Sequence, residues 1–547
     1  MSTQTVREAT LEVMRRRGLT TIFSNPGSTE VPFLAQLPDD FHFVLALHEG
    51  SVLGIATGYA IAHGRPAFAL VHTTAGLGNA VGGIATARVN RAPLVVVVGQ
   101  QDRRHLALEP FLAGKLEGLA GEYPLEVIAP VRAEDVPSAV ARASMVAEQG
   151  AGPVLVIVPM SDWNEPADPD ATAVASRVSL SAPSVPVDIQ LVAEALNAAG
   201  QPAIMAGSGN DTDAGWAALT ALAERLQAPV WIEPFGSRAG FNQTHPLYQG
   251  QLPADRPRVR QALDRTDVLL VVGTAAIRQY PYTTGPLVPE GTRVFVLTDD
   301  AVQANRSPAE LAVVGDPAAL CNAVTALLDQ RQAGTNAATS GQSAVGAAGA
   351  AAEQYRLPPP EAGEPLRAGH VFELLAARLA EDTILVEESP SSRPALQALV
   401  PARRPLGFLS AAMGGLGFAM PAAIGLKMAL PERPVVAVVG DGSSLYSIQS
   451  LWTAAQSGVG VVFLVLANGG YAVMDRLAEQ RDSKPAWPSF PEISVSTIAT
   501  GLGVSARRVQ DYSSLVEALD DVLAHPGRRT EPVLLEIAVA PDTTFAP

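Results

Sequence analysis

The chain has 547 residues, of which 48% are hydrophobic and 17% are charged, and its formal net charge at pH 7 is -16. This length exceeds what one hydrophobic core supports, so we expect about two to four domains. The acidic balance argues against nucleic acid or an anionic membrane as a partner, because both select a basic surface.

The N-terminal stretch, MSTQTVREATLEVMRRRG, has an amphipathic helical pattern and lacks the apolar core of a signal peptide. No apolar run in the sequence approaches the ~18 residues of a membrane span. The single cysteine, Cys321, excludes a disulfide framework and a multi-thiolate metal site. We therefore expect a cytoplasmic protein without a membrane segment.

Short β-branched runs alternate with Ala-rich stretches through the first third of the chain, in the order TTIFSNPG, FHFVLALHE, PAFALVHT, PLVVVVGQ and PVLVIVP. This alternation is typical of parallel sheets covered by helices. It predicts a first domain over residues 1–165, followed by a polar, Pro-rich connection to about residue 187.

The alternation resumes twice more along the chain. The stretches IQLVAEALNAAGQPAIMAGSG, DVLLVVGTA and TRVFVLTDD predict a central domain over residues 187–330. Residues 331–365 are rich in Ala, Gly, Ser and Pro without apolar periodicity, which indicates a linker. The stretches DTILVEES, PVVAVVGDG, GVVFLVLANGG and PVLLEIAV then predict a third domain over residues 366–547. The expected fold class is α/β, with three doubly wound parallel sheets.

Two turns of the third domain carry groups suited to a divalent cation. In VVGDGSS, Gly440 and Gly442 let backbone approach a ligand, and the following helix start favours a phosphate. Asp441 would repel that phosphate unless a cation bridged them, and magnesium takes hard oxygen ligands together with substrate phosphates. The next strand ends at Asn468 and Gly470, at the same sheet edge. We predict that Asp441, Asn468 and Gly470 hold Mg²⁺ or Ca²⁺, although each turn alone also fits an ordinary strand-ending turn.

The two turns together match the thiamine-diphosphate signature. With TIFSNPGSTEVPFL, ALHEGSVLGIATGYA, HTTAGLGNA, GGLGFAMPAAIG and GDGSSLYSIQSLWTAAQ, the chain resembles the thiamine-diphosphate-dependent 2-keto acid decarboxylases, and most of all the benzoylformate decarboxylases. The resemblance implies a pyrimidine-binding first domain, a Rossmann-like central domain and a diphosphate-binding third domain. It implies non-oxidative decarboxylation of an aromatic 2-keto acid to an aldehyde and carbon dioxide, and it allows carboligation. It also implies active sites between paired subunits of a homotetramer, a dimer of dimers.

The pyrimidine half of the cofactor has four expected contacts. Glu49 closes the predicted strand FHFVLALHE, and the resemblance implies that it bonds the ring nitrogen of the aminopyrimidine. By itself, Glu49 also fits a carboxylate at a helix start. The resemblance places Asn79 near the pyrimidine, gives the Gly414 backbone a bond to the amino group, and makes Leu416 an apolar wedge beneath the cofactor. Composition alone equally fits a Gly-rich turn with a core leucine.

Further cofactor contacts are expected on the first loop and around the diphosphate. On the first loop they are Asn25, Pro26 and Gly27; around the diphosphate they are Ser443, Tyr471 and Ser391. Ser391 is preferred because a proline precedes it where the family has a hydroxyl.

Three residues are expected to act on the substrate. His72 ends PAFALVH at the ligand edge of a sheet, where an imidazole can shuttle protons near neutral pH. Ser28 fits a helix N-cap, whereas the resemblance places it against the substrate carboxylate. Tyr280 stands where the family carries a second histidine. Its phenol, with a reference pKa of about 10, is the poorer proton donor at neutral pH, so His72 is expected to carry more of the proton transfer.

Three other functions fit parts of the sequence. A carboligase of the acetolactate synthase or benzaldehyde lyase type would use the same cofactor, in some cases with FAD in the central domain. A nicotinamide-dependent dehydrogenase would rely on MAGSGNDTD and VVGTAAIRQ, neither of which fits G-x-G-x-x-G. A non-catalytic paralogue is disfavoured because Glu49, His72, Asp441 and Asn468 are all retained.

Overall fold

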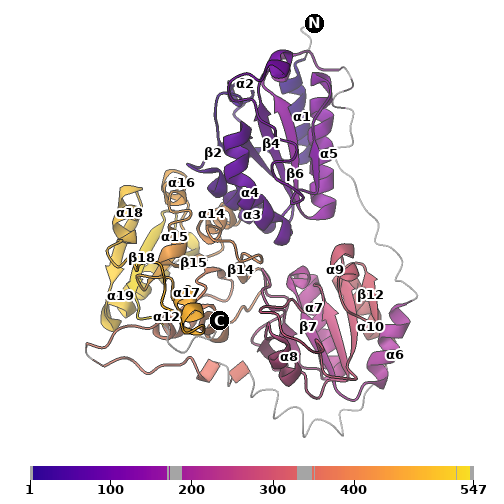
Figure 1. Cartoon of the computed structure of the whole chain (residues 1–547), viewed down its shortest axis with the longest axis vertical. Coiled ribbons are helices and arrows are strands. Elements are labelled where there is room, and N and C mark those ends of the chain that lie inside the picture. Colours follow the sequence, from indigo (N-terminus) through magenta and orange to yellow (C-terminus); the bar gives the residue numbers. More distant parts are fainter. Residues whose placement is uncertain are drawn as a thin grey trace.

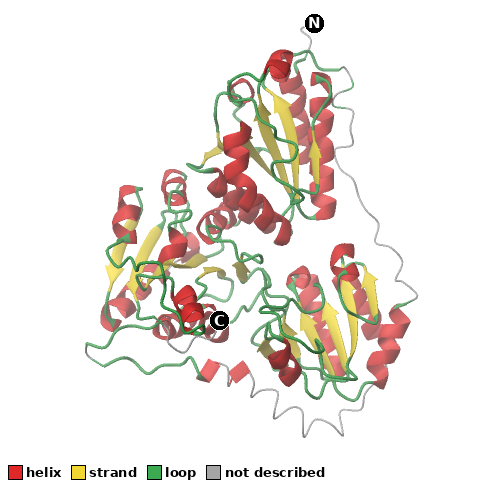
Figure 2. Ribbon diagram, viewed as in Figure 1, coloured by secondary structure: helices red, strands yellow, loops and turns green. Residues whose placement is uncertain are grey.

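The computed structural model of the protein describes residues 4–168, 170, 172, 188–328, 348–349, 352–361, 363–524 and 526–541. Three parallel six-stranded sheets, each covered by helices, follow one another along the chain (Figure 1, Figure 2). The expected α/β class with three parallel-sheet units is therefore confirmed. The predicted connection before residue 187 and the first part of the predicted linker, 331–347, lie almost entirely outside the described residues.

The first sheet has the strand order β2-β1-β3-β4-β6-β5. Its strands are β1 (Thr21–Asn25), β2 (His42–Leu45), β3 (Ala67–His72), β4 (Leu94–Gln100), β5 (Glu126–Ile128) and β6 (Pro153–Pro159). Its helices are α1 (Val6–Arg17), α2 (Val31–Leu34), α3 (Glu49–His63), α4 (Thr73–Val89) and α5 (Val136–Gly150). Every residue of β4 is buried, as expected for a strand covered on both faces.

The central sheet has the order β12-β11-β10-β7-β8-β9. Its strands are β7 (Pro202–Ala206), β8 (Val230–Ile232), β9 (Tyr248–Gln251), β10 (Val268–Val272), β11 (Arg293–Thr298) and β12 (Leu311–Val314). Its helices are α6 (Ile189–Ala198), α7 (Asp213–Leu226), α8 (Arg256–Ala262), α9 (Ala301–Asn305) and α10 (Pro317–Leu327). The strand order reverses between β7 and β10, so their carboxyl ends flank the crevice where such sheets bind ligands.

The third sheet has the order β14-β13-β15-β16-β18-β17, which repeats the pattern of the first. Its strands are β13 (Ile384–Glu388), β14 (Phe408–Ser410), β15 (Val435–Gly440), β16 (Val462–Ala467), β17 (Ser505–Val509) and β18 (Val533–Ala538). Its helices are α12 (Ala368–Ala376), α13 (Arg393–Leu399), α14 (Ala419–Ala429), α15 (Asp441–Ser444), α16 (Ser450–Gln456), α17 (Ala472–Glu479), α18 (Val495–Gly501) and α19 (Tyr512–Leu523).

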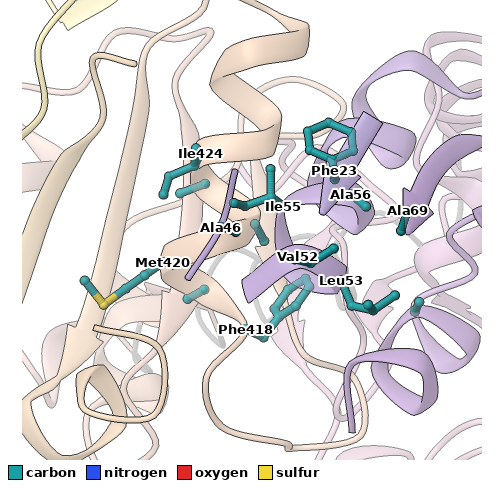
Figure 3. Packing of buried hydrophobic residues seen from close by; sticks show 14 of the residues in the cluster. Phe23, Ala46, Val52, Leu53, Ile55, Ala56, Ala69, Phe418, Met420 and Ile424 are labelled. Atoms are coloured by element: carbon teal, nitrogen blue, oxygen red, sulfur yellow. The ribbon is translucent and has the colours of Figure 1, made fainter. Parts of the chain in front are cut away.

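Helices α3 and α14 join the first and third domains backbone to backbone. A Cβ atom on Gly58 would lie 2.1 Å from the carbonyl oxygen of Ala422, and one on Gly425 would lie 1.9 Å from that of Ile55. Small residues therefore permit the close approach. Figure 3 shows Ile55 of α3 beside Ile424 of α14 in one hydrophobic cluster that includes residues of both sheets. The two domains thus share a core.

Candidate active site

Glu49 is the first residue of helix α3. The expectation that it closes a strand was wrong, because β2 ends at Leu45 and the chain turns before the helix begins. His48 caps that helix, and its Nδ1 accepts the backbone N–H of Gly50 at 3.0 Å. The buried Glu49 carboxylate consequently lies in the first turn of a 15-residue helix.

Two asparagines orient the Glu49 carboxylate. Asn25, the last residue of β1, donates from Nδ2 to Oε1 at 3.1 Å, and Asn79, on α4, donates from Nδ2 to Oε2 at 3.0 Å. From the sequence, Asn79 was predicted to lie near the pyrimidine, and Asn25 was predicted to contact the cofactor from the first loop. Amide donors fix the direction of a carboxylate without neutralising it. The arrangement fits an acceptor for a protonated ring nitrogen.

His72 ends strand β3, as predicted, and two residues missed in the sequence hold its ring. Nδ1 lies 2.8 Å from Thr29 Oγ1 and 3.0 Å from Glu30 Oε2. The Glu30 carboxylate is buried, and it also accepts the backbone N–H of Gly27 at 2.7 Å. Nε2 of His72 forms no hydrogen bond with the part of the chain that the structure describes, and it is the ring nitrogen available to a substrate. In the sequence, only the position of Thr29 and Glu30 directly after Ser28 indicates that they could be site residues.

Ser28 and Pro26 are exposed in the loop between β1 and α2. The alternative interpretation of Ser28 as a helix cap was wrong, because α2 begins at Val31 and Glu30 occupies its N-cap position. Strand β1 pairs with β3, with Asn25 opposite Val71, so this loop and His72 lie at the same edge of the first sheet. The Ser28 hydroxyl makes no hydrogen bond to any described residue.

Asp441 follows strand β15, and its side chain is buried. Oδ1 accepts the backbone N–H of Gly442 at 2.8 Å, and Oδ2 accepts that of Gly469 at 2.7 Å. Burial raises the pKa of the Asp441 carboxyl, and these backbone donors oppose that rise. Within the described ranges, no Lys, Arg or His side chain forms an ion pair with it. A buried carboxylate without a cationic partner fits a divalent cation.

Asn468 lies beside Asp441, because β15 and β16 are neighbours and Gly440 pairs with Leu466. The side-chain oxygen of Asn468 accepts the backbone N–H of Gly470 at 3.1 Å. The described residues contain no cluster of three His, Cys, Asp or Glu side chains that could hold a metal. A cation at Asp441 would therefore complete its oxygen shell with carbonyl, amide and phosphate oxygens, which is the chemistry that magnesium prefers.

On the diphosphate side of the site, the helix after the turn differs from the sequence prediction. The single helix expected after the turn is instead two short ones, α15 and α16. A Cβ atom on Gly442 would lie 2.7 Å from the ring of Tyr471, so glycine allows this tyrosine to cover the turn. The Tyr471 ring in turn packs on Phe490, with their centroids 5.1 Å apart. Ser443 is buried in the turn, and Ser391 lies half-buried after β13.

The predicted pyrimidine loop carries Gly414 at a φ of 75°, with no atom within 4 Å of an added Cβ. Leu416 exposes 36% of its surface, so its apolar side chain is accessible to a ligand, as the predicted wedge role requires. Behind the loop, the buried Glu388 carboxylate accepts the backbone N–H groups of Gly417, Phe418 and Ala419 at 2.6, 2.7 and 2.7 Å. Burial raises the pKa of Glu388 to about 7, against these three donors. Glu388 was not predicted as a site residue, because its only mark in the sequence is an acidic pair that ends an apolar strand.

Tyr280 lies in the central domain, in the loop after β10, and exposes 56% of its surface. Its ring packs edge-on against Phe235, with centroids 6.4 Å apart. No hydrogen bond, ion pair or ring contact between described residues joins Tyr280 to His72, or joins Glu49 to Asp441. The candidate residues of one chain form two groups, which we call half-sites: Glu49 and His72 on the first domain, and Asp441 and Asn468 on the third.

The sequence matches three domain families. They are the N-terminal TPP binding domain of thiamine pyrophosphate enzymes at residues 4–120, the central domain at 189–324 and the C-terminal TPP binding domain at 391–537. Benzoylformate decarboxylase of Pseudomonas aeruginosa is 36% identical over 554 residues, which covers 100% of both chains. A putative acetolactate synthase large subunit of Mycobacterium tuberculosis is 29% identical, covering 97% of this chain and 98% of that one.

A solved structure is similar over nearly the whole chain. The thiamine diphosphate-dependent 4-hydroxybenzoylformate decarboxylase of Rhodococcus jostii superposes with a TM-score of 0.90 at 33% identity, covering 99% of this chain and 100% of that one. The predicted family is therefore confirmed. The chain belongs to the thiamine pyrophosphate enzymes and, within them, to the 2-keto acid decarboxylases that resemble benzoylformate decarboxylase.

Proposed function

We propose that the protein decarboxylates an aromatic 2-keto acid to an aldehyde and carbon dioxide, using thiamine diphosphate and Mg²⁺. The observation that carries the proposal is the pair of acid–base groups at one edge of the first sheet. Glu49 is oriented there by two asparagines, and His72 is held by a buried carboxylate. Two relatives named for benzoylformate and 4-hydroxybenzoylformate support the aromatic class.

Each half-site would hold one end of the cofactor. Asp441, Asn468 and the Gly470 carbonyl would bind the cation, and Gly440, Gly442, Ser443, Ser391 and Tyr471 would surround the diphosphate. Glu49 would bond the pyrimidine ring nitrogen, with Asn25 and Asn79 fixing its direction. When bound, thiamine diphosphate supplies a carbon nucleophile that adds to the keto carbon and takes up the electron pair released with carbon dioxide.

His72 would handle the proton that completes the reaction. With Nδ1 facing Glu30, a ring protonated at both nitrogens would deliver its Nε2 proton to the carbon that carbon dioxide has left, and the neutral ring would then take a proton back from water. The Glu30 carboxylate lies where it can accept a hydrogen bond from the Nδ1–H of that ring. Ser28, with an exposed hydroxyl in the loop beside His72, would bind the substrate carboxylate, and the loop of Pro26 and Gly27 would line the same pocket.

We further propose that the protein works as a dimer of dimers in the cytoplasm. The family resemblance implies that a complete site forms between paired chains, with each chain supplying one of its two half-sites to that site. Large apolar side chains are also exposed, with Leu108 81% and Phe111 87% accessible in the single chain. Among the described residues, no helix combines the length and apolar character that crossing a membrane requires.

A carboligase that joins two carbonyl compounds is the second candidate, supported by the relative named as a putative acetolactate synthase. The central domain disfavours its flavin-containing form. At the crevice between β7 and β10, the buried Glu233 carboxylate accepts the backbone N–H and the hydroxyl of Ser208 at 2.7 and 2.8 Å, and the hydroxyl of Thr274 at 2.5 Å. The chain's own anion thus occupies donors that a nucleotide phosphate would need.

The test is carbon dioxide release from aryl and alkyl 2-keto acids, with thiamine diphosphate and Mg²⁺ present and with each omitted in turn. We expect the aryl acids to be preferred at least ~10-fold in kcat/KM, the size of effect that apolar pockets give. Product analysis should find aldehyde rather than 2-hydroxy ketone. Faster coupling of pyruvate than decarboxylation of any aryl acid would favour the carboligase instead.

A further inference from the structure

Three domains meet at residues 410–412, the segment that leads from strand β14 into the loop of Gly414 and Leu416. Ser410 is the last residue of β14, and the segment is buried. After Ser410 the backbone leaves the sheet, so the N–H and C=O groups there need other partners. These partners come from both of the other domains.

Asn90, the residue that ends helix α4 of the first domain, is fully buried against this segment. Its Nδ2 donates to the carbonyl oxygen of Ser410 at 2.9 Å, and its Oδ1 accepts the backbone N–H of Ala412 at 2.9 Å. The side-chain amide thereby pairs with the groups on both sides of Ala411, as a neighbouring strand would. Ala411 then accepts the backbone N–H of Gly414 at 2.9 Å. Asn90 thereby holds the backbone around Ala411, and Ala411 holds Gly414 through this hydrogen bond.

Arg278 of the central domain holds the same segment from another side. Its Nη1 donates to the carbonyl oxygen of Ala412 at 3.0 Å and to that of Phe235 at 3.3 Å. Hydrogen bonds from a charged guanidinium are stronger than those between neutral groups. Arg278 also lies two residues before Tyr280, so one side chain connects the cofactor loop with the loop that carries Tyr280.

Both ends of the loop are therefore fixed, and its middle is not. Asn90 and Arg278 hold its start, and Glu388 holds its end through three backbone N–H groups. Between them, Gly414 has open space around it and Leu416 is partly exposed. The middle of the loop thus leaves space beside Gly414 and part of the apolar Leu416 side chain accessible to a ligand.

We propose that Asn90 and Arg278 are positioning residues, which set the direction in which Gly414 and Leu416 meet the pyrimidine of the cofactor. This inference rests on the proposed function. It assigns to the first domain a second task besides carrying Glu49, namely to shape the cofactor loop of its own chain.

The test compares Asn90→Ala with Gln243→Ala in the full-length protein. Gln243 is a matched control because it also joins the third domain to another domain, with Oε1 accepting the N–H of Ala402 at 2.7 Å, outside the cofactor loop. Thiamine diphosphate binding in Mg²⁺ is measured by calorimetry, hydrogen–deuterium exchange at C2 of the cofactor is measured at saturation, and the melting temperature is measured without cofactor. We expect Asn90→Ala to weaken cofactor binding about 10-fold, as loss of two hydrogen bonds would, and to slow C2 exchange. Gln243→Ala should lower the melting temperature without changing either cofactor measurement.

Arg278→Met and Arg278→Lys form the second test, which decides the matter if Asn90→Ala does not fold. The lysine retains a charged donor toward the Ala412 carbonyl, so it should restore much of the exchange rate that the methionine loses. Wild-type binding and exchange in both Asn90→Ala and Arg278→Met would overturn the proposal. Equal losses in Gln243→Ala would overturn it too, by showing a general loosening of the domains. If the wild-type protein itself bound no thiamine diphosphate, the proposed function would be at fault instead.

Discussion

The ring of His72 is held by two oxygen atoms of different character. Thr29 Oγ1 and Glu30 Oε2 both lie within 3.0 Å of Nδ1, but only the Glu30 carboxylate is able to carry charge. A hydrogen-bond partner on one ring nitrogen orients the imidazole and influences which tautomer it adopts. In the proposed function, Glu30 would act as a positioning residue behind His72 without touching the substrate.

His72→Ala should reduce the decarboxylation turnover by at least ~10²-fold, the usual contribution of a positioned general acid. Glu30→Gln should cost roughly 10-fold, because the amide still reaches the ring but supplies no charge. Tyr280→Phe, which removes one hydroxyl from the central domain, serves as the comparison and should cost less than His72→Ala. All three are measured as kcat on one aryl 2-keto acid. A Glu30→Gln enzyme within about twofold of wild type would contradict the role given to this carboxylate.

Asp441→Asn tests the proposed cation site. Burial raises the pKa of Asp441 and so opposes its charge, which means that a neutral amide should leave the cofactor-free fold intact. Calorimetry should then detect no binding of thiamine diphosphate, with or without Mg²⁺. Asn468→Ala should behave in the same way. Tight, Mg²⁺-dependent binding by either variant would remove these residues from the metal site.

Residues at strand ends were predictable, and residues that act through distant backbone were not. Asp441 and Asn468 could be placed together because apolar strands precede both and parallel strands end at one edge. Glu388 also ends a strand, but its partners are backbone groups of Gly417, Phe418 and Ala419, and no local pattern connects them. The role of Asn90 was hidden in the same way.

The turn between β14 and α14 depends on Glu388 for its shape. The turn brings three backbone N–H groups together, and their carboxylate acceptor lies in a buried position where charge is costly. The free energy of the folded state should therefore depend on the charge of this one side chain, and pH offers a direct way to change it.

The pKa of Glu388 is raised by burial to about 7, from its ordinary 4.5, so between these values the folded chain holds a proton that the unfolded chain has released. Its contribution to the stability of the fold is consequently greatest below that window and is lost as pH rises toward 7. The melting temperature of Glu388→Gln, minus that of wild type, should increase from about pH 5 to pH 8, corresponding to at most roughly 3 kcal/mol. A difference in melting temperature that stays constant across this pH range would show that Glu388 has the same pKa in the folded and unfolded chains.

The first and third domains are held in one arrangement by the crossing of α3 with α14 and by the shared core around it (Figure 3). The two helices touch through backbone, so their spacing cannot change without moving a whole domain. The crossing therefore sets the position of Glu49, which begins α3, relative to the loop of Leu416, which leads into α14.

Gly58→Ala tests that rigidity, because its added Cβ would lie 2.1 Å from the Ala422 carbonyl oxygen. We expect a loss of about 1–3 kcal/mol, the usual cost of overpacking, seen as a lower melting temperature. Gly501→Ala is the control, since it changes a helical glycine with nothing within 4 Å of the new Cβ. Equal melting temperatures for Gly58→Ala and Gly501→Ala would mean that the helices separate without cost.

The crossing of α3 with α14 also has a symmetry. Each helix follows the second strand of its sheet, and the two sheets have the same strand order. Gly58 contacts Ala422, which lies three residues before Gly425, and Gly425 contacts Ile55, which lies three residues before Gly58. Such reciprocal contacts are the mark of an isologous interface between identical subunits. The first and third domains therefore meet through a pseudo-twofold contact, in which each helix offers a glycine to the backbone of the other.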